Sequence, residues 1–109
     1  MRFMLEVTIP TEAGNAAIRD GCLGSKLKSI LADVKAEAAY FTEESGQRVG
    51  FIVVDVAGAS SIPLVAEPFF LTFEARVEFH PVMLPQDLEA VDFASVVQKY
   101  GRTPAMAGA

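Results

Sequence analysis

The chain has 109 residues, enough for one domain with a single hydrophobic core. Its net charge of −5 at pH 7 argues against binding to nucleic acids or anionic membranes, because both require clustered basic residues. The single cysteine, Cys22, excludes an intrachain disulfide and a cysteine-based zinc site. No signal-peptide pattern precedes the first strand pattern and no apolar run could span a bilayer, so we expect a cytoplasmic protein.

Alternation of apolar and polar residues predicts a first strand from Arg2 to Ile9, which Pro10 ends. Apolar residues at helical spacing then predict a helix between Thr11 and Val34. Glycine weakens a helix by roughly 1 kcal/mol relative to alanine. We therefore expect this helix to be kinked or split near Gly21.

A second strand is expected from Ala36 to Thr42 and a third from Arg48 to Val56, joined by a hairpin loop that contains Gly46. Both faces of the third strand are mainly apolar, which is typical of a central strand covered on both sides. Because 51% of all residues are apolar, a second copy of the chain is the natural cover for the second face of the sheet.

The next apolar stretch, Ile62 to Ala66, predicts a short helix that Pro63 disturbs and that ends near Pro68. A fourth strand follows from Ala75 to Val82 and should lie at an edge of the sheet or end at Pro81, because proline cannot donate to a ladder.

A last helix opens at Pro85, and we expect its apolar residues to pack on the rest of the protein. The prediction is one domain over residues 1–100 and a flexible tail over 101–109. The apolar residues of this last helix are Leu88, Val91, Phe93, Val96 and Val97.

The element order βαββαβ, followed by an extra C-terminal helix, predicts an α+β domain of the ferredoxin-like type, also called a plait. In this plait the fourth strand pairs with the first. With the second sheet face covered by a partner copy, the expected assembly is a homodimer through the sheet face.

Several stretches support a resemblance to known proteins. The chain resembles the muconolactone-isomerase-like proteins, which are dimeric α+β barrels, in Val53–Val56, Ala66–Phe70 and Glu78–Pro81. It is still more similar to a group of small bacterial proteins of this fold without an assigned function, in Asp20–Gly24, Glu37–Phe41 and His80–Met83. The resemblance implies that two ferredoxin-like sheets face each other with the helices outside. It assigns no catalytic residue.

His80 is the only histidine and the first candidate for acid–base chemistry, since its ordinary pKa suits proton transfer near neutrality. Pairing of the fourth strand with the first would bring Glu78 and His80 beside Glu6. These three residues are the predicted catalytic set. The alternatives are that His80 only orients the turn at its strand end and that Glu6 forms a salt bridge with Arg48 or Arg76.

Four aromatic residues could line a pocket for an apolar ligand, although such residues are more often part of the core. They are Tyr40, Phe51, Phe69 and Phe70.

Two classes of function therefore remain open. The first is a small-molecule enzyme or binder, isomerase- or monooxygenase-like, that needs no cofactor or metal and takes an apolar or aromatic ligand. The second is a non-catalytic homo-oligomeric domain with a structural or regulatory role. A cavity that reaches His80 together with Glu6 or Glu78 would favour an enzyme, whereas a fully packed sheet would favour the second class.

Overall fold

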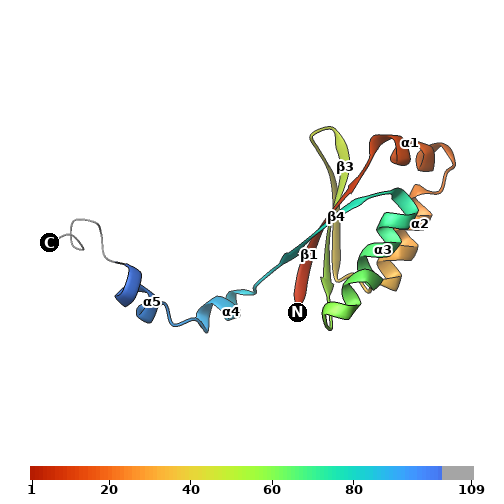
Figure 1. Cartoon of the computed structure of the whole chain (residues 1–109). Helices are drawn as coiled ribbons and strands as arrows, with labels where there is room; N and C mark the ends of the chain where they lie inside the picture. Colours follow the sequence, from red (N-terminus) through yellow and green to blue (C-terminus); the bar gives the residue numbers. More distant parts are fainter. Residues whose placement is uncertain (102–109) are drawn as a thin grey trace.

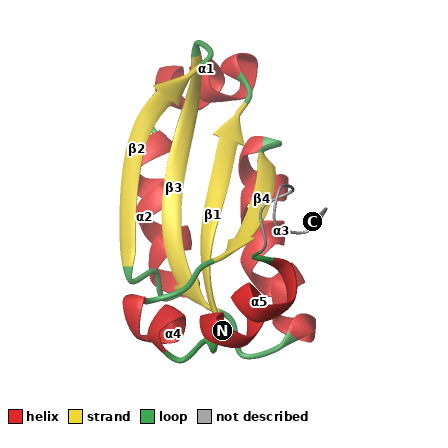
Figure 2. Cartoon of the chain, turned by 90° about the vertical axis from the view of Figure 1, so that its left-hand side faces the viewer, coloured by secondary structure: helices red, strands yellow, loops and turns green. Residues whose placement is uncertain are grey.

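The computed structural model describes residues 1–101. Within these residues the protein is an α+β domain built on a four-stranded sheet, with the strands in the order β2-β3-β1-β4 and all neighbours antiparallel (Figure 2). This arrangement is compatible with the ferredoxin-like fold. The strands are β1 (Arg2–Ile9), β2 (Ala38–Glu44), β3 (Gln47–Asp55) and β4 (Arg76–Pro81). The helices are α1 (Thr11–Arg19), α2 (Leu23–Asp33), α3 (Ile62–Phe73), α4 (Pro85–Glu89) and α5 (Phe93–Tyr100).

All three helices that precede β4 cover the same face of the sheet, and the core lies between them and the strands (Figures 1 and 2). Strand residues at alternating positions point into this core, as the period-two pattern predicts. Leu5, Ile52 and Val54 are fully buried there, together with Phe69 of α3. We call this side of the sheet the helix face.

The predicted break in the first helical stretch is confirmed. α1 ends at Arg19 and α2 begins at Leu23, and Gly21 between them has φ +69°. Glycine adopts this left-handed conformation without the steric cost that a Cβ would bring. The hairpin between β2 and β3 uses the same device, since Ser45 and Gly46 both have positive φ in a two-residue turn.

The helix after β3 is longer than predicted. α3 continues through Pro68 to Phe73, so the expectation that Pro68 stops it was wrong. Pro63 lies in the first turn, where a missing N–H costs little. Burial of Phe69 and Phe73 against the sheet outweighs the hydrogen bond lost at Pro68.

The C-terminal segment does not pack as predicted. The single helix expected there is two helices, α4 and α5, and every residue from Met83 to Gly101 is exposed. We call residues 83–101 the arm. It extends away from the sheet on the side opposite α1, α2 and α3 (Figure 1). The radius of gyration is 19.5 Å, compared with about 13 Å for a compact domain of this length. The predicted tail, apart from Gly101, lies outside the described residues.

Within residues 1–101, no helix covers the second face of the sheet, and Figure 2 looks directly onto this face. We call it the open face. Met4, Phe51 and Val53 are half-buried on it, and Tyr40 is 71% exposed. We expected β3 to be covered on both sides. Within residues 1–101 of one chain, helices cover β3 on the helix face alone. In the part of the chain that the structure describes, no helix has the length and apolar character needed to cross a membrane.

Candidate functional site

A cluster of one histidine and two carboxylates lies on the open face. The register places Met4 opposite His80 and Glu6 opposite Glu78, so the side chains share one face of the β1–β4 pair. His80 Nε2 lies 3.6 Å from Glu6 Oε2 and 3.6 Å from Glu78 Oε2. We call Glu6, Glu78 and His80 the polar cluster. The structure thus brings together the three residues that the sequence analysis named, and their catalytic role stays a prediction.

Glu6 is the most buried member of the polar cluster. Its side chain is only 18% exposed, whereas that of His80 is 47% exposed. Hydrogen bonding with Glu44, then with Glu78, and its desolvation together raise the pKa of Glu6 above its ordinary value. A carboxyl group with a raised pKa beside an imidazole forms a pair between which a proton can move.

The ion pairs that were alternatives for Glu6 are not formed in the described residues. Arg48 donates to Asn15 Oδ1 at 3.1 Å on the helix face, and Arg76 lies 3.7 Å from Glu78 Oε1. The ligating atoms of Glu6, Glu78 and His80 all lie within 4.8 Å of one another. This geometry would let the polar cluster share a proton or coordinate a divalent cation.

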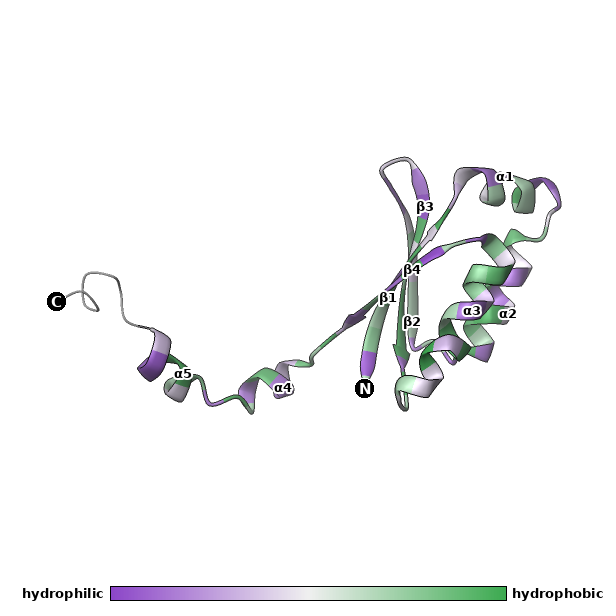
Figure 3. Cartoon of the chain, viewed as in Figure 1, coloured by the Kyte–Doolittle hydropathy of each residue, from purple (hydrophilic) through white to green (hydrophobic). Residues whose placement is uncertain are grey.

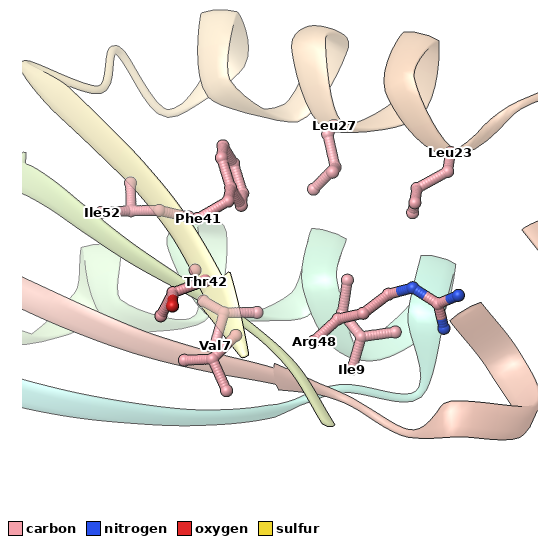
Figure 4. Close-up of a pocket in the computed structure, with 10 residues that line it drawn as sticks. Val7, Ile9, Leu23, Leu27, Phe41, Thr42, Arg48 and Ile52 are labelled. Atoms are coloured by element: carbon pink, nitrogen blue, oxygen red, sulfur yellow. The ribbon is translucent and has the colours of Figure 1, made fainter. Parts of the chain in front are cut away.

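A separate apolar cavity of about 260 Å³ lies on the helix face, between α2 and the sheet (Figure 4). Leu23 and Leu27 point into it from α2, and Phe41 points into it from β2. Arg48 lies at one end, with its guanidinium beyond Ile9 in this view. The remaining lining residues are Val7, Thr42, Val49, Gly50 and Ile52.

Two glycines allow side chains to adopt the positions that shape this cavity. A Cβ added at Gly50 would meet Phe41 Cε1 at 2.9 Å, closer than real side chains approach. A Cβ at Gly14 would overlap the Arg48 guanidinium. Gly50 therefore lets the Phe41 ring lie over β3, and Gly14 lets Arg48 lie beside α1.

The four aromatic residues predicted to line a ligand pocket lie elsewhere. Phe69 is fully buried in the core and Phe70 is 39% exposed on α3. Tyr40 and Phe51 lie opposite each other on the open face. The aromatic residue that lines the cavity is Phe41, which the sequence analysis did not select. Alternation along β2 could have found it, because Phe41 and Tyr40 must face opposite sides of the sheet.

Cys22 is a half-buried thiol at the start of α2, with its Sγ 3.6 Å from the Ala17 carbonyl oxygen. This position fits a structural thiol, since it has neither a histidine nor a basic side chain as a hydrogen-bond partner among the described residues.

Comparison with the models of known protein families and with curated proteins found no match to this chain. The fold and the two sites therefore define the class of protein only as a small α+β domain on a four-stranded antiparallel sheet.

Proposed function

We propose that this protein binds a small apolar or aromatic compound that carries an anionic group, in the cavity between α2 and the sheet. The observation that carries the proposal is an apolar lining with Arg48 at one end. Apolar cavities of this kind bind apolar ligands because water gains little by entering them. Among residues 1–101, no carboxylate forms an ion pair with the half-buried Arg48, so its charge is free to pair with an anion.

Binding is better supported than catalysis because the cavity and the polar cluster lie on opposite faces of the sheet. Val7 and Ile9 of β1 line the cavity, whereas Glu6, the residue before Val7, points to the open face. A ligand in the cavity is separated from His80 by the sheet itself. The cavity therefore lacks the contact with His80 that would favour an enzyme.

Calorimetric titration with octanoate and with octan-1-ol tests the proposed ligand class. We expect octanoate to bind at least about tenfold more tightly than octan-1-ol, because a charge-assisted hydrogen bond contributes roughly 1.5–3 kcal/mol. The variant Arg48→Met should remove this preference and retain binding of the alcohol. Leu27→Trp should fill the cavity and abolish binding of both compounds.

Two control variants separate binding from general effects on the fold. Lys28→Trp adds the same ring one residue further along α2, on an exposed side chain, and should leave binding unchanged. Asn15→Ala removes the hydrogen-bond partner of Arg48 but retains its charge, so the preference for octanoate should persist. Equal binding to wild type and Leu27→Trp would contradict the proposal.

We further infer that the protein is a homodimer in which two open faces meet, as in a dimeric α+β barrel. Met4, Phe51 and Val53 supply apolar area at the centre of this face, and the tyrosine at its β2 edge is mostly exposed. Two sheets that stack face to face lie about 10 Å apart, which would enclose both polar clusters between them.

Sedimentation equilibrium of two neighbouring variants tests this dimer. Val53→Asp places a charge on the open face and should yield a folded monomer, whereas Val54→Asp places it in the core and should prevent folding. A wild-type chain that stays monomeric at 100 micromolar would contradict the dimer, as would a Val53→Asp variant that dimerises normally.

A second candidate function is acid–base catalysis by the polar cluster, inside the dimer. It is favoured by the distance of 3.6 Å from His80 Nε2 to the carboxylate of Glu6, whose pKa is raised. Exchange of the methyl protons of acetophenone in D2O reports this chemistry by NMR. The wild-type protein should accelerate the exchange, and His80→Gln and Glu6→Gln should not. If the wild-type protein does not accelerate the exchange, ligand binding remains as the one proposed function.

A further inference from the structure

The arm consists of two helices whose apolar side chains stay exposed among residues 1–101. Phe93, Val96, Val97 and Tyr100 recur at spacings of three and four residues, which places them along one side of α5. Leu84, Leu88 and Val91 follow the same spacing around α4. All of these side chains are at least 44% exposed. Figure 3 shows the resulting apolar segments in both helices.

Helices as short as these require a surface to pack on. α4 has 5 residues and α5 has 8, whereas isolated helices below about 12–15 residues are marginal in water. Both nevertheless begin with specific capping bonds. Asp87 Oδ2 accepts from the Leu84 N–H at 2.7 Å, and Asp92 Oδ1 accepts from the Ser95 N–H at 3.1 Å. The sequence thus specifies two helices whose apolar sides are left uncovered by the part of the chain that the structure describes.

The connection to β4 directs the arm away from its own sheet. The Val82 N–H still donates to the Arg2 carbonyl oxygen at 3.1 Å, so only Met83 and Leu84 separate the sheet from α4. Leu84 precedes Pro85 and is extended, with φ −84° and ψ 161°. Because both Pro81 and Pro85 restrict this link, it has little freedom to turn the arm back onto the open face of the same chain.

We propose that the arm of each subunit packs against the body of the partner subunit. This proposal rests on the homodimer proposed above. The arm leaves on the side of the open face, so a partner stacked on that face lies beside it (Figure 1). A two-fold axis makes the exchange reciprocal, and both arms are then covered by the same contact. Exchange of an identical element is a low-cost way to stabilise a dimer.

Sedimentation equilibrium of two adjacent arm variants of the full chain tests the proposal. Val97→Asp places a charge on the apolar side of α5 and should weaken the dimer at least tenfold. Gln98→Asp places the same charge one position further along the helix, outside the apolar set, and should leave the dissociation constant within twofold of wild type. Equal dissociation constants for the two variants would overturn the proposal.

Hydrogen exchange of the α5 amides at several protein concentrations identifies the surface that covers the arm. If the partner covers it, these amides are protected in the dimer and exchange freely on dilution to the monomer. Protection that persists in the monomer would show that the arm folds back on its own chain, and no protection in the dimer would show that the partner subunit does not cover it. Both outcomes overturn the proposal but leave the sheet-face dimer intact, whereas a monomeric wild type would refute both.

Discussion

The imidazole Nε2 of His80 lies 3.6 Å from the carboxylate of Glu6, and the two residues come from the last and the first strand of the sheet. Their contact exists because β4 pairs directly with β1 and both side chains point to the open face. Glu78 lies at the same distance from His80. Two carboxylates and one imidazole therefore share a small region that a stacked second sheet would remove from bulk water.

The raised pKa of Glu6 makes stability depend on pH. In the range between its ordinary value of 4.5 and its higher value in the folded protein, the folded state binds more protons than the unfolded state. The free energy of unfolding should therefore fall as pH rises through this range. Glu6→Gln removes the titration, so the variant should gain stability relative to wild type as pH increases from 4 to 8.

Urea denaturation across this pH range, at one fixed protein concentration, measures the effect. Glu67→Gln on α3 removes one exposed negative charge and controls for the change in net charge. If the free energies of unfolding of Glu6→Gln and wild type differ by a constant amount from pH 4 to pH 8, the assigned environment of Glu6 is contradicted.

Replacement of adjacent aromatic residues on α3 distinguishes core from surface. Phe69→Ala removes a fully buried ring and should lower the free energy of unfolding by about 3–5 kcal/mol. Phe70→Ala removes a ring that is already partly exposed and should cost about 1 kcal/mol or less. Thermal and urea unfolding of both variants provide the comparison. Similar losses would mean that α3 is rotated relative to the sheet.

Alanine substitutions at two glycines near the junction of α1 and α2 should change the stability of the protein in opposite directions. Gly21 has φ +69°, so Gly21→Ala should destabilise the protein by about 1 kcal/mol. Gly24 lies within α2 with open space around it, so Gly24→Ala should stabilise by up to about 1 kcal/mol. Denaturant midpoints of the two variants on the same side of wild type would contradict the described break between the helices.

Local patterns in the sequence were sufficient to predict most of the fold. Local patterns identified all four strands, with alternation as the signal for the first, and the pairing of the fourth with the first followed from the element order. Pro68 does not end α3 because burial of Phe69 and Phe73, which follow it, outweighs the local cost of proline. The last helix was expected to pack because its residues are apolar, but apolar spacing does not say which molecule provides the cover.

The two sites differ in how far the sequence could predict them. Proximity of His80 and Glu6 followed from the element order, which predicts that the fourth strand pairs with the first, and from side-chain alternation within each strand. The cavity depends on how α2 lies over β2 and β3 and on the space that Gly50 leaves for Phe41. Such packing distances are a property of the tertiary structure, so no pattern in the sequence indicates them.

Methyl NMR of the wild-type protein during titration with octanoate is the most direct test of the proposed binding site. We predict saturable shifts of the Leu23, Leu27 and Val7 methyl groups, which line the cavity. The Val53 methyl groups on the open face should not shift. Saturable shifts confined to Val53, or no saturable shift at the cavity residues, would contradict the proposal that the cavity between α2 and the sheet is the ligand site.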